Sequence, residues 1–244
     1  MKSKKKLNIL GLIGARSGSK GVPNKNIKLF NGLPLMGSII EKAKKSNYIN
    51  KIVLSTDSSE YADIGKSFGA EIPCLRPENL AQDNSPEIEF VKHMLEYLSD
   101  KEDYKPDIVV RLMSTIPFQT TEDIDNVIKI LLNDGDADSA VVISEGRQHP
   151  QKALKILEDD NKNKRLVTYY SLSGREVTPI ARQNYQKAYF RSNIIACKTS
   201  TIFKTNSLTG DLVKYYIIPQ ERAIDIDNEI DFKICENIIN LINF

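Results

Sequence analysis

Short apolar segments alternate with helix-length segments through the first 145 residues, and this alternation restricts the fold more than any other feature. The apolar segments are rich in Ile, Val and Leu and nearly continuous, which is typical of strands buried on both faces. We expect strands at residues 7–13, 51–55, 71–75, 107–112 and 138–143. We expect helices at residues 35–45, from about 58, at 85–98 and at 121–132. The pattern predicts an α/β fold with a mostly parallel, Rossmann-like sheet covered on both faces.

The alternation stops after Ser144. Residues 145–187 are polar, contain His-Pro and Thr-Pro turns and show no helical period, so we interpret them as an inserted arm that contacts a second subunit. Strand-like and helical patterns return afterwards, at residues 189–197, 215–219 and 229–242. Because there is neither an internal repeat nor a low-complexity linker, we expect one domain over residues 1–244 that carries this dimerisation arm.

Composition and charge exclude several classes of protein. The 34 basic and 32 acidic residues give a net charge of +2, too balanced for a general nucleic-acid binder. Three widely spaced cysteines fit neither a zinc site nor a redox pair, which favours the reduced cytoplasm. Lysines precede the apolar run at residues 7–13, as in a signal peptide, but Asn8 interrupts the run. The run is also too short to cross a membrane, so a buried first strand is the better interpretation.

A glycine-rich, cationic segment follows the first expected strand, at the edge of the sheet where open parallel sheets bind ligands. Residues 14–26 have the sequence GARSGSKGVPNKN. Exposed backbone N–H groups and the cations Arg16, Lys20 and Lys25 suit a polyphosphate. The segment matches neither the Walker motif nor GxGxxG, and its Ser-x-x-Lys match to penicillin-binding proteins lacks the companion motifs. A solvated glycine turn with incidental charges is the alternative.

Two carboxylates close to the last expected helix suggest a metal site. On an extended strand, Asp225 and Asp227 point to the same side and can share a hard cation such as Mg²⁺. Alternatively, Asp227 or Asn228 caps the helix that follows. Together with the cationic segment, the pair favours metal-assisted chemistry on a nucleotide.

Four motifs occur in the order GARSGSKGVPNKNI, STDS at 55–58, RPENLAQDNSP at 76–86 and AIDIDNEIDF at 223–232. Together they resemble the acylneuraminate cytidylyltransferases, the CMP-sialic acid synthetases, and the resemblance extends over nearly the whole chain. It implies a nucleotidyltransferase fold, CTP and Mg²⁺ as requirements, and a nonulosonic acid as acceptor. It also implies a homodimer in which an arm reaches into the partner's site.

The resemblance assigns roles residue by residue. It implies that the nucleotide is bound by Gly14, Ala15, Arg16, Ser19, Lys20, Lys25, Asn26, Arg76 and Ser85. It implies that the sugar acid is contacted by Met113, Lys152, Arg182 and Asn193. Asp225 and Asp227 match the metal pair, and the residues expected to act in catalysis are Arg16, Lys20 and Asp225.

The acceptor half departs from the family pattern. RLMSTIPFQ stands where the family often has LLQPTSPLR, so Met113 replaces a glutamine that contacts the sugar. NIIACK stands where NGAIYI is usual, which predicts that Cys197 replaces a tyrosine of the pocket. These changes favour legionaminic, pseudaminic or a related acid over sialic acid.

We therefore expect a cytoplasmic enzyme of cell-surface glycan synthesis that transfers CMP from CTP to the anomeric hydroxyl of a nonulosonic acid. Neither nucleic acid nor membrane is an expected partner. Two alternatives remain at this point. One is a glycosyltransferase that uses a sugar nucleotide and an Asp-bound metal, and the other is a catalytically silent nucleotide-binding protein.

Overall fold

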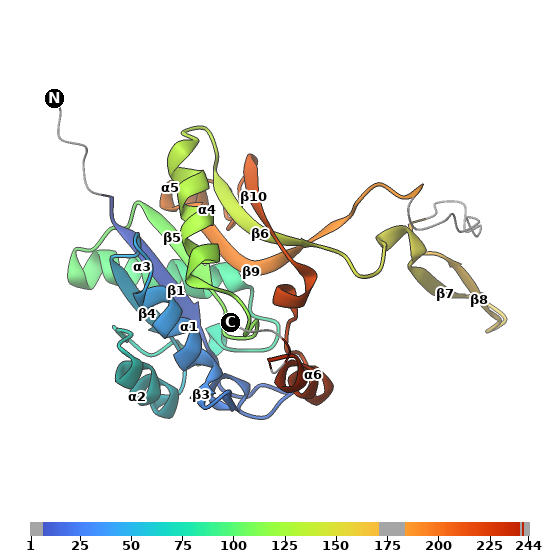
Figure 1. Cartoon of the computed structure of the whole chain (residues 1–244), viewed down its shortest axis with the longest axis horizontal. Helices are drawn as coiled ribbons and strands as arrows, with labels where there is room; N and C mark the ends of the chain where they lie inside the picture. Colours follow the sequence, from blue (N-terminus) through green and yellow to red (C-terminus); the bar gives the residue numbers. More distant parts are fainter. Residues whose placement is uncertain (1–6, 171–183, 240, 242–244) are drawn as a thin grey trace.

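The computed structural model describes residues 7–170, 184–239 and 241. A six-stranded sheet forms its centre, in the order β10-β6-β9-β5-β1-β4 (Figure 1). Its strands are β1 (Ile9–Gly14), β4 (Lys51–Ser55), β5 (Ile108–Leu112), β6 (Ser139–Glu145), β9 (Tyr189–Lys198) and β10 (Val213–Ile218). Only β9 is antiparallel to its neighbours, so the mostly parallel sheet expected from the sequence is confirmed. The carboxyl ends of the other five strands therefore lie along one edge.

Helices cover both faces of this sheet. They are α1 (Leu35–Lys44), α2 (Ser59–Phe68), α3 (Glu87–Glu102), α4 (Thr121–Asn133), α5 (Thr199–Thr205) and α6 (Glu229–Ile239). Alternate residues of β1 point to opposite faces: Ile9 packs in a core with α1, α2 and α4, whereas Leu10 packs in a second core with α3 and α5. A third, smaller core joins α6 to the loops around Val22, Phe30 and Phe118.

The helix starts follow from capping chemistry. Thr120 accepts a hydrogen bond from the Asp123 backbone, and the Asp123 carboxylate accepts one from the Thr120 backbone, so the two residues form a capping box at the start of α4. Ser58 caps α2 by accepting from the Tyr61 backbone N–H at 3.3 Å, and Gly69, with φ of 95°, ends that helix in the left-handed region.

The expected strand at residues 71–75 is wrong. Only Glu71 pairs with the sheet, through a single parallel bridge to Val53. Pro73 has no N–H group to continue the ladder, so the segment leaves the sheet at once.

Two small elements lie outside the expectations. The hairpin β2 (Leu29–Phe30) and β3 (Leu33–Pro34) turns at Asn31-Gly32, whose positive φ angles of 50° and 80° are typical of a tight hairpin. Helix α5 follows β9 directly and has only seven residues, too few to give a clear period in the sequence.

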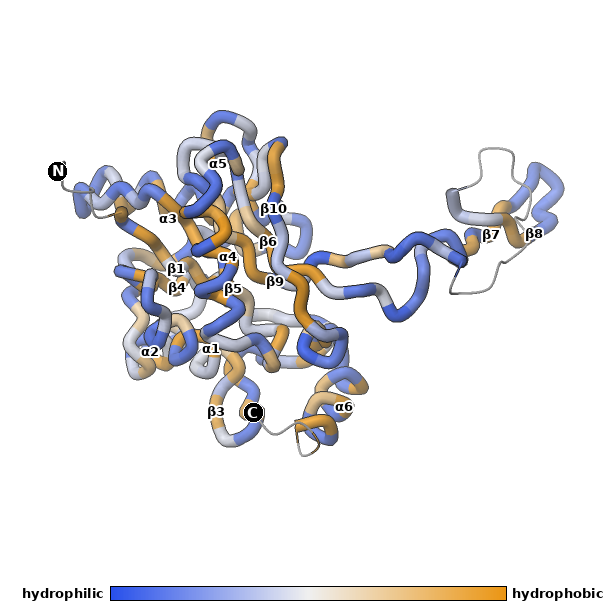
Figure 2. Tube along the Cα trace, turned by 45° about the horizontal axis from the view of Figure 1, so that its top comes forward, coloured by the Kyte–Doolittle hydropathy of each residue, from blue (hydrophilic) through white to orange (hydrophobic). Residues whose placement is uncertain are grey.

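The expected arm leaves the body between β6 and β9 (Figures 1 and 2). Its described part contains a short 3-10 turn (Pro150–Lys152) and an antiparallel hairpin of β7 (Leu154–Glu158) and β8 (Lys164–Thr168). The hairpin lies well away from the central sheet in both views. Residues 171–183 of the arm, including Arg182, lie outside the described residues.

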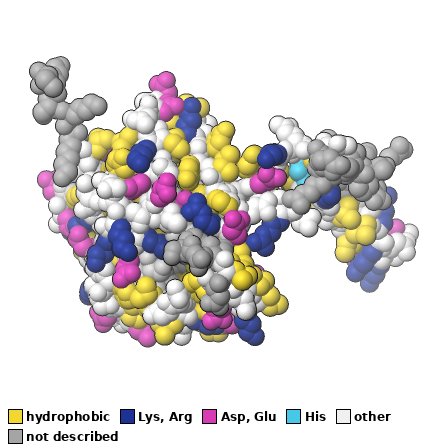
Figure 3. All heavy atoms as spheres, in the orientation of Figure 1, with side chains coloured by type: hydrophobic (Ala, Val, Ile, Leu, Met, Phe, Trp, Pro, Cys, Tyr) yellow, Lys and Arg dark blue, Asp and Glu magenta, His cyan; other side chains and the backbone are white. Residues whose placement is uncertain are grey.

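One face of this hairpin exposes three apolar side chains beside the Glu158–Lys164 ion pair. Leu154, Ile156 and Leu166 share that face and are 48%, 67% and 64% exposed. Hydrophobic and cationic side chains lie together at this end of the molecule (Figure 3). Among the described residues, no helix has the length and apolar character needed to cross a membrane.

Candidate active site

A cleft of about 500 Å³ opens at the carboxyl ends of β1 and β5. Most of the residues that we expect to bind the nucleotide or the metal line this cleft. They are Gly14, Arg16, Ser19, Lys20, Lys25, Asn26, Arg76, Ser85 and Asp227. Met113, expected on the acceptor side, lines the same cleft. The fold thus gathers side chains that are more than 200 positions apart in the sequence. Ala15 contributes no side chain to the cleft, because it is buried in the core and its N–H donates to the Ser55 carbonyl at 3.0 Å.

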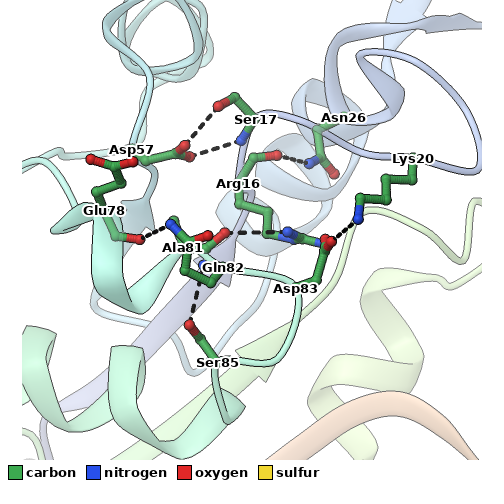
Figure 4. Close-up of polar contacts among 10 residues, drawn as sticks. All are labelled: Arg16, Ser17, Lys20, Asn26, Asp57, Glu78, Ala81, Gln82, Asp83 and Ser85. Carbon is green, nitrogen blue, oxygen red and sulfur yellow. Dashed lines mark hydrogen bonds and ion pairs between the residues drawn. The ribbon is translucent and has the colours of Figure 1, made fainter.

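Hydrogen bonds on both sides fix the path of the cationic segment (Figure 4). The Ser17 backbone and hydroxyl donate to the two Asp57 oxygens at 2.8 and 2.6 Å. Asn26, 5% exposed, donates from its amide to the Arg16 carbonyl at 2.9 Å and accepts from the Ser114 hydroxyl at 2.5 Å. The segment is therefore a braced loop and not a free glycine turn.

The three cations of this loop have different partners. Arg16 and Lys20 both pair with Asp83, on the opposite wall of the cleft (Figure 4). Lys25 donates to the Ile226 carbonyl at 2.5 Å and lies 3.9 Å from an Asp227 oxygen. Lys25 thus ties the loop to the segment that carries the two aspartates.

Gly21 explains why this loop needs glycine. A Cβ atom there would lie 1.9 Å from the Asp227 carbonyl oxygen, far inside contact distance. Only a residue without a side chain allows the two segments to pass this closely.

Arg76 forms a rigid part of the cleft wall. It is 6% exposed, donates to the Ser55 hydroxyl and carbonyl at 3.0 and 2.7 Å, and lies 4.1 Å over the Phe90 ring. Burial lowers the pKa of Arg76 to about 10, which still leaves the guanidinium charged at neutral pH. Gly14 borders the same ring, since a Cβ atom there would lie 2.7 Å from Phe90.

The two aspartates flank a buried residue. Ile226 is buried in the third core and its N–H donates to the Thr115 carbonyl at 2.9 Å, so the side chains of Asp225 and Asp227 leave the opposite side of an extended segment. Asn193 donates to one Asp225 oxygen at 2.8 Å. The other Asp225 oxygen is buried without a well-formed hydrogen bond among the described residues. Burial, and then the Asp227 charge, raise the pKa of Asp225.

The cap of α6 belongs to Asn228 and not to Asp227. The Asn228 side chain accepts from the Ile230 and Asp231 backbones at 2.9 and 3.0 Å. Asp231 returns the interaction by accepting from the Asp227 and Asn228 backbones. The Asp227 carboxylate takes no part in this cap and stays 78% exposed. Of the two interpretations of these residues, the cap therefore applies to Asn228, and Asp227 faces the cleft.

The residues expected to contact the sugar are not gathered in this cleft to the same degree. Lys152 lies in the arm, where its ammonium is 5.6 Å from the Tyr185 ring. Asn193 is hydrogen-bonded to Asp225 and is not one of the residues that line the cleft. The expectation for Cys197 is wrong: β9 pairs Cys197 with Val109, near the amino end of β5, and its thiol is buried in the second core. That burial raises the pKa of Cys197 to about 12.

Sequence reasoning missed a buried arginine next to the site. Arg111, 6% exposed, lies 2.9 Å from a Glu87 oxygen and donates to the Asn193 carbonyl at 3.2 Å. Glu87 lines the cleft, and Asn193 holds Asp225. The sequence held one sign of its importance: Arg111 is a charged residue within a strand that we expected to be buried on both faces.

A mostly parallel α/β sheet that ends in a braced, cationic glycine loop beside Asp227 is the arrangement that suits a nucleotidyltransferase. The chain belongs to the cytidylyltransferase family, whose model, described as Cytidylyltransferase, matches residues 10–237. The family resemblance expected from the sequence motifs is therefore confirmed.

Relatives of known name match most of the chain. It is 32% identical to Post-translational flagellin modification protein B of Campylobacter coli, over 95% of this chain and 94% of that protein. It is 31% identical to CMP-N,N'-diacetyllegionaminic acid synthase of Legionella pneumophila, over 96% and 97%. It is 28% identical to N-acylneuraminate cytidylyltransferase of Escherichia coli, over 94% of this chain but 52% of that protein, so the chain spans about half its length.

Solved structures support the fold. CMP-2-keto-3-deoxy-manno-octonic acid synthetase, in complex with CTP, superposes with a TM-score of 0.68 at 13% identity, over 96% of this chain and 99% of that one. A 4-diphosphocytidyl-2C-methyl-D-erythritol synthase from Anaerococcus prevotii superposes with a TM-score of 0.61 at 14% identity, over 97% and 100%.

Proposed function

We propose that this protein transfers CMP from CTP to the anomeric hydroxyl of a nonulosonic acid and releases pyrophosphate. The observation that carries the proposal is the braced loop, which presents Arg16, Lys20 and Lys25 along one wall of the cleft, beside Asp227. The names of the relatives, which include an N-acylneuraminate cytidylyltransferase and a CMP-legionaminic acid synthase, support the same reaction.

The cleft suits the nucleotide by size and charge. A volume of about 500 Å³ lies within the range of small-molecule sites. The acceptor hydroxyl attacks the α-phosphorus in line, and the bond to the pyrophosphate oxygen breaks. Arg16 and Lys20 bind phosphate oxygens and neutralise the charge that develops on the leaving group. Arg76 and Ser85 form the wall for the cytidine.

Asp225 and Asp227 fit a magnesium ion. The exposed Asp227 carboxylate offers one hard oxygen ligand at the cleft, and the buried Asp225, two positions earlier, would supply the second. The described residues contain no cluster of three or more acidic, His or Cys side chains, so the remaining ligands would be phosphate oxygens and water. Bound there, Mg²⁺ would supply charge neutralisation and a lower pKa for the acceptor hydroxyl. Asn193 orients Asp225, and Lys25 holds the segment between the two carboxylates.

For the acceptor side we propose a homodimer in the cytoplasm. The hairpin of the arm lies far from the central sheet (Figure 1) and exposes Leu154, Ile156 and Leu166, as expected of a segment that packs on a second subunit. In this arrangement Lys152 and Arg182 reach the partner's site, where Arg182 receives the acceptor carboxylate and Lys152 belongs to the sugar pocket.

The acceptor we favour is a bacterial acid of the legionaminic or pseudaminic type. Met113 lines the cleft and offers only a weak sulfur acceptor where an amide would both donate and accept. A hydroxyl-rich sialic acid side chain would therefore lose partners, at about 1–3 kcal/mol for each buried unsatisfied group. Two of the relatives named above act in flagellin modification or make CMP-legionaminic acid, by their names.

Pyrophosphate release from CTP and Mg²⁺, measured across a panel of nonulosonic acids, tests the proposal. The expected result is turnover with at least one 9-deoxy diamino acid, a higher kcat/KM than with N-acetylneuraminic acid, and a shift toward the latter in Met113→Gln. Lys20→Ala and Arg16→Ala should each lower turnover by about 10²–10³, because each removes a charge-assisted contact.

The same assay separates the alternatives. A glycosyltransferase would consume a sugar nucleotide without releasing pyrophosphate from CTP, and a silent nucleotide-binding protein would bind CTP without turnover. Near-normal turnover in Lys20→Ala would contradict the assignment of the loop.

A further inference from the structure

A carboxylate lies between the two cations that we assign to the phosphate groups. One oxygen of Asp83 lies 2.7 Å from an Arg16 guanidinium nitrogen, and the other pairs with the Lys20 ammonium (Figure 4). Among the described residues, no other carboxylate pairs with either cation. Asp83 lines the cleft and lies in a motif whose residues we assign to the nucleotide only at Arg76 and Ser85.

The backbone on both sides of Asp83 is fastened. Gln82 donates from its N–H to the Ser85 hydroxyl at 3.1 Å and from its amide to the Glu78 carbonyl at 2.9 Å, and its carbonyl accepts from the Ser85 N–H at 3.2 Å. Arg16 adds a bond to the Ala81 carbonyl at 3.2 Å. The loop backbone therefore places the Asp83 carboxylate beside the two cations, of which Arg16 is 33% exposed and Lys20 is 81% exposed.

The charge of Asp83 determines how its contacts with Arg16 and Lys20 affect phosphate binding. Lys20, and then Arg16, hold the pKa of Asp83 below its usual range, so the carboxylate is ionised at neutral pH. A carboxylate with both oxygens on cationic donors takes the place that two phosphate oxygens would take on the same donors. The Asp83 carboxylate and a phosphate chain cannot both occupy the same N–H groups of Arg16 and Lys20.

We propose that Asp83 is an internal competitor of the phosphate chain: it holds Arg16 and Lys20 in place in the nucleotide-free enzyme and is displaced by a ligand that carries a pyrophosphate unit. The proposal rests on the proposed function of this cleft. The competition should affect some ligands and not others. A nucleoside triphosphate or inorganic pyrophosphate must break both contacts, whereas a nucleoside monophosphate, with fewer charges, need not. After the reaction, Asp83 recaptures the two cations and helps pyrophosphate to leave.

The test compares ligand affinities of the full-length wild-type chain and Asp83→Asn by calorimetry, with CTP, inorganic pyrophosphate and CMP as separate probes at one Mg²⁺ concentration. Exposed ion pairs contribute little each, so removing two of them should tighten pyrophosphate and CTP binding by about three- to tenfold. CMP affinity should stay within about twofold. Asp63→Asn, which removes the same charge from an exposed pair with Lys66 on α2, is the matched control and should change none of the three.

A second variant separates competition from loop damage. In a Lys20→Ala background, Asp83→Asn should tighten pyrophosphate binding less than it does in the wild type, because one of the two contacts is already gone. Pyrophosphate should also become a stronger product inhibitor in Asp83→Asn.

Two results would overturn the proposal. Unchanged or weaker pyrophosphate binding in Asp83→Asn would mean that the carboxylate supports the loop without competing, while CTP binding by the wild type would leave the proposed function intact. If the wild type bound neither CTP nor pyrophosphate, the proposed function itself would fall, and this inference with it.

Discussion

Arg111 carries a charge inside β5, where only 6% of its surface is exposed. Burying a charge costs several kcal/mol, and a hydrophobic side chain of similar volume often gives equal or greater stability. Arg111 instead joins Glu87, on the cleft wall, to the backbone of Asn193, whose amide holds Asp225. The contact runs from the proposed nucleotide wall to the proposed metal ligand, so we expect it to affect the reaction by positioning Asn193.

Arg111→Leu should lower kcat about tenfold more than any loss of folded protein explains, because Asn193 loses a hydrogen bond from a charged donor. Arg111→Lys restores the charge without the planar fork and should recover only part of the loss. Turnover and urea unfolding, measured on the same samples, separate the two effects. If kcat is unchanged in Arg111→Leu, the contact serves packing alone.

The sequence could predict some of these residues and not others, for a physical reason. Arg16, Lys20 and Lys25 lie within ten positions of one loop, so local sequence is enough to place them together. The pairing of Asp83 with that loop, and of Arg111 with Glu87, depends on how α3 and the preceding loop pack on the sheet. No local pattern encodes those distances.

Elements were predictable where a repeating pattern spans them. The strands of the parallel sheet and the long helices have such a pattern, and their positions agree with the expectation to within a few residues. The two strands of the arm hairpin lack such a pattern. One face of the hairpin is exposed, and apolar and polar residues do not alternate regularly along its strands. The pairing with the sheet ends after Glu71, because Pro73 has no N–H group to continue it.

The cap of α6 gives a prediction at this scale. Asn228→Ala should lower the free energy of unfolding by about 1 kcal/mol, with turnover following the folded fraction. Asp227→Asn and Asp225→Asn should instead abolish Mg²⁺-dependent turnover, and the exposed Asp227 should do so with little loss of stability. Urea unfolding and a Mg²⁺ titration of turnover on each variant make the comparison. Residual activity of Asp227→Asn that does not respond to Mg²⁺ would contradict the metal assignment.

Lys42 of α1 gives a pH-dependent prediction. Its ammonium donates to the Pro117 carbonyl at 2.6 Å, and burial lowers its pKa from 10.5 to about 8. Between these two values the unfolded chain binds more protons at this site than the folded chain, so the contribution of Lys42 to stability rises with pH. Relative to Lys42→Met, the wild type should gain roughly 1–3 kcal/mol between pH 7.5 and pH 10. Urea unfolding at several pH values measures this gain, and a constant difference would contradict it.

At the scale of the whole molecule, the arm is joined to the centre of the sheet. It emerges between β6 and β9, which stay paired as far as Glu145 and Tyr189, and the Gly146 N–H donates to the Ala188 carbonyl at 2.8 Å. This double connection, with two paired strands at its base, gives the arm a firmer attachment than a single-chain tether. Such an attachment suits a segment that must place side chains in a neighbouring subunit.

Mixed dimers test that arrangement. A Lys20→Ala subunit and an Arg182→Ala subunit are each expected to be inactive as homodimers. In a heterodimer, one of the two sites would combine an intact loop with an intact arm, so about half of the activity of the wild-type dimer should return. Absence of rescue in a verified heterodimer would place Arg182 in the site of its own chain.

The antiparallel strand β9 has a consequence for how the chain folds. It lies between β5 and β6, so the pair β6–β10 meets β1, β4 and β5 in the hydrogen-bonded sheet only through this later segment. A growing chain can pair β1, β4 and β5 early, but it presents an open edge on β5 until the arm has been made and the strand after it inserts. Such non-local pairing slows folding and prolongs exposure of strand edges. Because β9 also carries Asn193, the step that closes the sheet brings Asn193 to Asp225.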